Sequence, residues 1–101
     1  TNPTLGTQVV DNQSIEMLGI RPNPFRDRCE LHFSLKKTGE VELSVFNILG
    51  KKIAEEQRHF FDGENVWLLD ASNFGDASAG VFFVKLKTET GEATERVVRQ
   101  R

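Results

Sequence analysis

Turn residues divide this chain into short segments, and this division limits the fold more than any other feature. Turn-forming residues recur at short intervals along the sequence: Pro22-Asn23-Pro24, Thr38-Gly39, Leu49-Gly50, Asp62-Gly63, Ala79-Gly80 and Thr90-Gly91. Between them lie runs rich in Val and Phe, which fit a pleated, half-buried surface. Helix-period patterns are absent. Short strands separated by regular turn signals are typical of a β-sandwich or a β-barrel.

Seven segments have the pattern of strands. They cover residues 15–20, 29–35, 41–47, 51–60, 64–70, 80–88 and 92–100. Short turns link them in sequence, which favours an all-β fold, a seven-stranded immunoglobulin-like antiparallel β-sandwich. The Cys–Trp–Cys spacing of a true immunoglobulin domain is missing. We expect one domain over residues 15–101, preceded by a polar linker from an upstream cargo over residues 1–14.

Alternation within these segments predicts which side chains form the core, because side chains of a strand point to opposite faces in turn. The inward sets are Cys29, Leu31, Phe33 and Leu35, then Val41, Leu43 and Val45, then Phe82, Val84 and Leu86. Phe25 follows a corner with two prolines, and we expect it to close one end of the core. Residues 51–60 are polar and long, which favours an edge or outer strand. Residues 71–79 are expected to form a loop.

Charge and composition exclude several classes of protein. Thirteen basic and fifteen acidic residues give a net charge of −2, whereas a nucleic-acid-binding domain usually carries a basic field. No apolar run approaches the roughly 18 residues of a membrane span. The single cysteine, Cys29, excludes an internal disulfide. No secretory signal stands at the start, and Thr1 in place of Met suggests a fragment of a longer chain.

Catalytic and metal-binding residues are not apparent. His32 and His59 have no neighbouring nucleophile in a recognisable arrangement, and His32 lies on the outward face of its strand, as a solvated histidine would. Cys29 alternates with core residues and is expected to behave as a small hydrophobe. The acidic residues of one region are Asp62, Glu64, Asp70 and Asp76. Their spacing is not that of a calcium loop, so we predict no catalytic residue, no metal ligand and no cofactor.

Aromatic residues leave a second class of function open. Trp67 and the pair Phe60-Phe61 could stack on a sugar, as in a carbohydrate- or surface-binding module appended to a secreted hydrolase. A single Trp in a small sandwich is more often part of the core, and the chain has no Tyr to extend a stacking array. The exposure of these rings distinguishes a sugar-binding role from a role in the core, because a sugar-binding module exposes Trp67 or the pair Phe60-Phe61.

The chain ends on two strand patterns joined by the Thr90-Gly91 turn. The pattern of the second strand runs almost to the last residue, where Arg96, Arg99 and Arg101 are expected to be exposed. Basic residues on an edge strand can simply prevent unwanted pairing. They can also form a recognition surface at the end of the chain. The residues alone leave both explanations open.

Four segments together resemble a known family. They read "IRPNPFRDRCELHFSL", "GEVELSVFNILGKKI", "DGENVWLLDASNFGDASAGVFFVKLKT" and "EATERVVRQR". In order and spacing they are similar to the C-terminal sorting domains of proteins exported by the type IX secretion system of Bacteroidetes-type bacteria. Phe46 and Phe82 stand where that family usually has Tyr. The related domain of flagellar hook-capping proteins usually carries Trp-Asp-Gly where this chain reads "VWLLDASNF".

The resemblance implies a sorting signal for transport rather than an enzyme. Its implied partners are the outer-membrane translocon and a sortase-like peptidase, which would cut within residues 1–14 and join the cargo to surface lipopolysaccharide. The implied location is the cell surface or the medium, reached through the periplasm. The residues implied in translocon recognition are Gly80, Val81, Phe82, Phe83, Val84, Lys85, Thr94, Arg96, Val97, Val98, Arg99, Gln100 and Arg101. The exposed edge of the last strand is also expected to accept a partner strand or to form an edge-strand homodimer.

Overall fold

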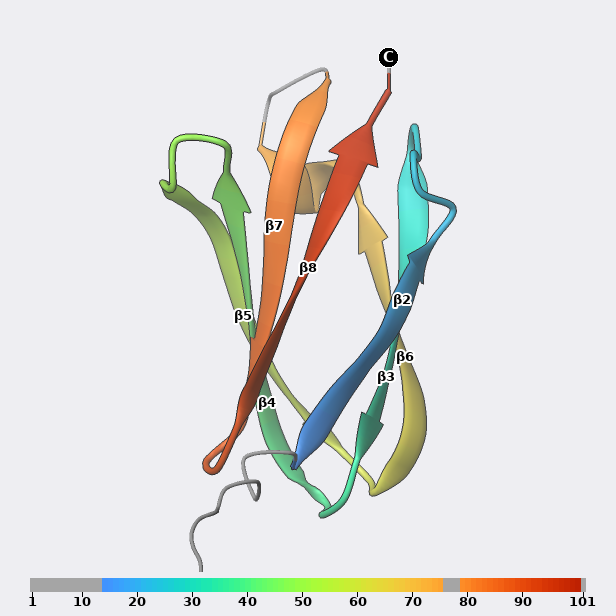
Figure 1. Cartoon of the computed structure of the whole chain (residues 1–101), viewed down its shortest axis with the longest axis vertical. Helices are drawn as coiled ribbons and strands as arrows, with labels where there is room; N and C mark the ends of the chain where they lie inside the picture. The colour runs from blue at the N-terminus through green and yellow to red at the C-terminus, as the bar shows by residue number, and fades with distance from the viewer. Residues whose placement is uncertain (1–13, 76–78, 101) are drawn as a thin grey trace, which may run out of the picture.

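The computed structural model describes residues 14–75 and 79–100, which form two antiparallel sheets packed face to face (Figure 1). The strands are β2 (Ile15–Arg21), β3 (Arg28–Leu35), β4 (Gly39–Asn47), β5 (Lys52–Phe60), β6 (Gly63–Asp70), β7 (Gly80–Lys87) and β8 (Glu92–Arg99). A 3₁₀ helix, η2 (Ala71–Phe74), follows β6, and these ranges contain no α-helix. The seven predicted strands are confirmed.

The strand order is that of a sandwich. One sheet runs β2-β3-β6 and the other runs β5-β4-β7-β8, and every neighbouring pair is antiparallel. β5 lies at an edge, as its polar sequence predicts. The turn between β4 and β5 contains Gly50 at a φ of 86°, a conformation that glycine adopts without the steric cost of a Cβ.

The core fills the space between the sheets. Every residue that the alternation assigns to it is buried, from Cys29 on β3 to Leu86 on β7. Burial of one large aliphatic or aromatic side chain contributes about 1.5–3 kcal/mol, so these inward rows hold the two sheets together. The register follows from the same pattern, because a slip of one residue would turn each inward row to solvent.

Three phenylalanines close one end of the core. Phe25 is buried, which confirms its predicted position, and its ring centroid lies 4.8 Å from that of Phe74. Phe74 in turn lies 5.2 Å from Phe82 on β7. Residues 71–79 were predicted as a loop, and no sequence pattern identified Phe74. Residues 71–74 instead form η2 and bury Phe74.

The proline corner pairs with the last strand, and this differs from the expected open edge. The Phe25 N–H donates to the Val98 carbonyl (2.9 Å), and the Gln100 N–H donates to the Phe25 carbonyl (2.6 Å). The Asn23 amide bonds the same strand twice, accepting from the Val98 N–H (3.0 Å) and donating to the Arg96 carbonyl (3.2 Å). We call these four bonds the corner clasp. The outer edge of β8 is therefore occupied near its end.

Contacts between the two sheets close one side of the sandwich. β2 lies alongside β8, and the corner and the C-terminal end of β8 meet at the same end of the molecule (Figure 1). At the opposite end a hydrogen bond of 2.8 Å joins the hydroxyls of Ser14 and Thr88. The remaining sheet edges are β5 and β6.

Candidate recognition surface

The outer face of β7 and β8 carries six of the residues implied in recognition. Three cross-strand pairs lie along it: Val81 with Val98, Phe83 with Arg96, and Lys85 with Thr94. All six side chains are exposed or half-buried. The alternation predicted this outward position for Val81, Phe83 and Lys85, and the structure confirms it. These pairs form one continuous surface beside the end of the chain, which we call the recognition face.

Other residues of the implied set lie elsewhere. Phe82, Val84 and Val97 are buried in the core, so their side chains are not accessible at the surface of the folded domain. Gly80 is half-buried opposite Arg99, Gln100 is exposed within the corner clasp, and Arg101 lies outside the described residues.

The cations near the chain end differ in accessibility. Arg96 is exposed, as predicted. Arg99 is half-buried rather than fully exposed, and its Nε donates to the Arg26 carbonyl at 3.0 Å. That bond anchors Arg99 to the proline corner, which lies 73 residues earlier in the chain. The Lys85 ammonium pairs with Glu92 at 3.1 Å. Arg96 is therefore the more exposed of the two cations on the recognition face, the other being Lys85.

Sequence reasoning missed two neighbours of this face. Phe46 on β4 pairs in register with Phe83, and Lys52 on β5 pairs with Phe46. The Lys52 ammonium lies 6.0 Å from the Phe46 ring centroid, at the outer limit of a cation–π contact. Lys52, Phe46, Phe83 and Arg96 thus form one row across all four strands. Alternation along residues 41–47 places Phe46 outward, but its neighbours follow only from the strand order.

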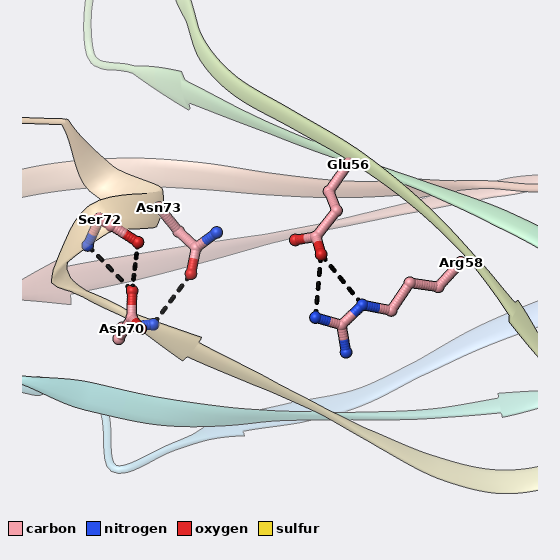
Figure 2. A network of polar contacts seen from close by, with 5 residues as sticks. All are labelled: Glu56, Arg58, Asp70, Ser72 and Asn73. Atoms are coloured by element: carbon pink, nitrogen blue, oxygen red, sulfur yellow. Dashed lines mark hydrogen bonds and ion pairs between the residues drawn. The ribbon is translucent and has the colours of Figure 1, made fainter.

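Trp67 is not a sugar-stacking residue. Its exposure is 0%, and its ring lies 5.1 Å from Phe60, which packs against the core. The Arg58 guanidinium covers the same ring at 5.2 Å and is held by Glu56 (Figure 2). Phe61 is 73% exposed, but one ring does not make a stacking platform. The aromatic platform required by the sugar-binding alternative is not formed.

Asp70 caps η2 and has a perturbed carboxyl. Its Oδ1 accepts from the Ser72 hydroxyl (2.5 Å) and from the Ser72 N–H (3.0 Å), while the Asn73 side chain accepts from the Asp70 N–H (Figure 2). The Ser72 hydroxyl bond is the main reason why the pKa of Asp70 is lowered, with smaller contributions from the Ser72 N–H and the charge of Arg28. The ionised form is the one that caps the helix.

This cap gives the domain an acid-sensitive element. The folded-state pKa of Asp70 lies below its unfolded value. The contribution of Asp70 to the free energy of unfolding is therefore present above about pH 4 and is lost as the pH falls further. Asp70→Asn keeps an acceptor oxygen but does not titrate. We expect the difference in urea midpoint between wild type and Asp70→Asn to shrink between about pH 6 and about pH 3. A difference that stays constant over this range would contradict the assignment.

Cys29 is a structural thiol. It is 3% exposed, and burial raises the pKa of its thiol from 9.0 to about 12. The thiolate is the reactive form of cysteine. A rise of this size lowers the thiolate fraction by roughly a thousandfold. Cys29 therefore has the inert, core-filling role expected from its place in the alternation.

Thiol labelling checks this directly. We expect Ellman's reagent to leave the native protein unlabelled at about pH 8, because burial suppresses the thiolate. It should label one thiol per chain once guanidinium chloride unfolds the domain. Labelling of the native chain at the rate of the unfolded one would mean that Cys29 is accessible.

The remaining polar groups of the described residues do not converge on a reactive centre. His32 pairs with Glu30 at 3.0 Å and His59 pairs with Glu40 at 3.4 Å, both toward solvent. His32 is half-buried rather than fully solvated. No group of three or more potential metal ligands occurs within residues 14–75 and 79–100. The same ranges contain no helix that is long and apolar enough to cross a membrane.

The geometry defines an all-β sandwich with an accessible face at its C-terminal strands. The chain matches the model of the secretion system C-terminal sorting domain over residues 19–100, and it belongs to this family. A comparison with curated proteins finds no significant match. The family is that of type IX secretion signals, which direct a cargo in the same chain to the cell surface or the medium.

Proposed function

We propose that the outer-membrane translocon of the type IX system reads this domain through the recognition face of β7 and β8. Family membership over residues 19–100 supports the general role. The outward position of Phe83 and Arg96 supports the particular surface, because an aromatic and a cationic side chain are accessible together as register partners. The domain acts as a sorting signal and takes no part in catalysis. The cargo reaches the translocon through the periplasm.

We place recognition on the face of β8 rather than on its edge. Strand addition requires unpaired backbone groups at an edge. The corner clasp already occupies the Arg96 carbonyl, both backbone groups of Val98 and the Gln100 N–H. The same occupation works against an edge-strand homodimer along this part of β8. The exposed Arg96 side chain can still enter an acidic groove while its carbonyl is bonded.

We further propose that a sortase-like peptidase removes the domain within residues 1–14 and that the cargo then joins lipopolysaccharide. The assignment of residues 1–14 as linker and 15–101 as signal is part of this proposal. Mass spectrometry of the exported cargo tests it. The expected new carboxyl end lies before Ile15, with β2 to β8 absent. Exported cargo that retains residues 15–101 would contradict removal while leaving the export role intact.

A double variant tests the recognition face. Phe83→Ser with Arg96→Glu changes two accessible side chains and leaves the core unchanged. We expect export of a fused reporter to fall at least about tenfold, which corresponds to about 1.4 kcal/mol of lost recognition. Leu49→Ser with Lys37→Glu is the matched control, since both of its sites are exposed and the change in polarity and charge is the same. Equal export of the two variants would mean that the translocon does not recognise the domain through the recognition face.

A further inference from the structure

Ser14, the residue before β2, is bonded to two turns that are distant from it in the sequence. Its carbonyl accepts from the Lys36 N–H at 3.0 Å, in the turn between β3 and β4. Its hydroxyl lies 2.8 Å from the hydroxyl of Thr88, in the turn between β7 and β8. We call these two bonds the Ser14 anchor. Because β2 and β8 belong to different sheets, the anchor joins the two sheets at the end opposite the corner clasp.

Thr88 is a fixed partner for Ser14. Its N–H donates to the Gly91 carbonyl at 2.8 Å, and its hydroxyl accepts from the Gly91 N–H at 3.1 Å. A side chain that its own turn already holds loses little further freedom when it bonds Ser14. The start of β2 is therefore tied to the hairpin that carries the recognition face.

The first part of β2 depends on this anchor. Ile15, Glu16 and Met17 pair with β3, but the register shifts between Met17 and Gly19. An irregularity of this kind interrupts the ladder, so the three pairs before it form a short unit at the end of a strand. Strand ends open more easily than strand centres. The Ser14 anchor and the buried Ile15 side chain oppose opening of this unit from the cargo side.

The anchor also fixes the place where the cargo joins the domain. Thr88 lies about 16 Å along β7 from Phe83, at roughly 3.3 Å per residue. The corner clasp and the C-terminal end of β8 lie at the other end of the molecule (Figure 1). Chain that precedes Ser14 therefore joins the domain away from Phe83 and Arg96, and a bulky cargo need not cover that pair.

We propose that Ser14 is a positioning residue for removal of the domain: through its anchor it closes β2 to the peptidase, so that the cut falls before Ser14. This inference rests on the proposed removal within residues 1–14. A peptidase acts on chain that is free of ladder hydrogen bonds, so its access to β2 follows the fraction of molecules in which β2 is open. The anchor lowers that fraction.

Hydrogen exchange of the full chain measures the anchor, with the Lys36 amide as the reporter. Ser14→Ala keeps the backbone carbonyl and removes only the hydroxyl. We expect the Lys36 amide to exchange about fivefold faster in this variant, as for the loss of one hydrogen bond. Thr88→Ser keeps its hydroxyl and should retain the wild-type rate. Ser72→Ala is the matched control, because it removes a serine hydroxyl bond at η2 and should also retain that rate.

Limited digestion with proteinase K, followed by mass spectrometry, locates the boundary directly. The resistant fragment of the wild type is expected to begin at or before Ser14. Ser14→Ala should yield an additional fragment that begins between Ile15 and Gly19, and Thr88→Ser should not yield it.

Two results would overturn the proposal. One is a Ser14→Ala variant with the wild-type exchange rate at Lys36 and the wild-type fragment. The other is an equal effect of Ser72→Ala, which would indicate a general loss of stability. Either result would contradict the anchor and leave export and removal untouched, whereas exported cargo that keeps residues 15–101 would contradict removal itself.

Discussion

A chain that ends at Ala93 is expected to lose its cooperative unfolding transition and to fail in export. The deletion removes most of β8, which pairs with β7 from Glu92 to Arg99. It also removes Val97, whose exposure is 0%, and both backbone partners of Phe25. Loss of one buried side chain typically costs about 2–5 kcal/mol, and the stability of a whole domain is only about 5–15 kcal/mol.

Far-UV circular dichroism during urea unfolding measures this effect. The Phe83→Ser, Arg96→Glu variant is the informative comparison, because it keeps every buried core residue and should retain a cooperative unfolding transition while failing in export. The chain ending at Ala93 could instead keep a sharp transition, with a free energy of unfolding within about 1 kcal/mol of the wild-type value. In that case β8 would be an addition to an already stable fold. The corner clasp would then be unimportant for folding.

Trp67→Ala is expected to destabilise the domain by about 3–5 kcal/mol. Trp67 is buried between Phe60 and the core row of β3, where Leu31 is its register partner. Alanine leaves a cavity that the surrounding strands fill only in part, and it removes the ring over which Arg58 lies. Because Trp67 is the single Trp of the chain, unfolding is followed by circular dichroism rather than by fluorescence.

Trp67→Phe is the matched control. The Trp67 indole N–H has no acceptor among the described residues, so its removal leaves no partner unsatisfied. We expect Trp67→Phe to lower the free energy of unfolding by less than half as much as Trp67→Ala does. A polysaccharide that protects wild type but not Trp67→Ala from urea would contradict the buried, structural role and would restore the sugar-binding interpretation.

Much of the fold follows from local sequence pattern. Period-two alternation identifies the strands and predicts that Leu31, Leu43 and Val84 face the core, while glycines such as Gly50 locate the turns. These signals are local, because side-chain direction in a strand depends on position alone. The edge position of β5 also follows from its polar composition.

The features that the sequence did not predict depend on contacts between distant segments. Asn23 and Val98 are 75 residues apart, and no local pattern indicates that the proline corner bonds the last strand. Phe74 was missed for a related reason, because its burial depends on Phe25 and Phe82. A short 3₁₀ turn has too few residues to show a period.

The recognition face was predictable in part. Alternation gives the outward direction of Phe83 and Lys85, but the accessibility of Arg99 depends on its bond to Arg26. The row from Lys52 to Arg96 depends on the strand order β5-β4-β7-β8. That order is fixed by which strands pair across the sheet, and alternation within one strand carries no information about it.

Export of a fluorescent cargo tests the central claim most directly. The cargo carries a signal peptide and is fused ahead of residues 1–101, in a host with the type IX machinery and in the same host without its translocon. The account predicts fluorescence at the cell surface or in the medium in the first host and in the periplasm in the second. Retention in the periplasm of both hosts, while the first still exports its own type IX substrates, would contradict it.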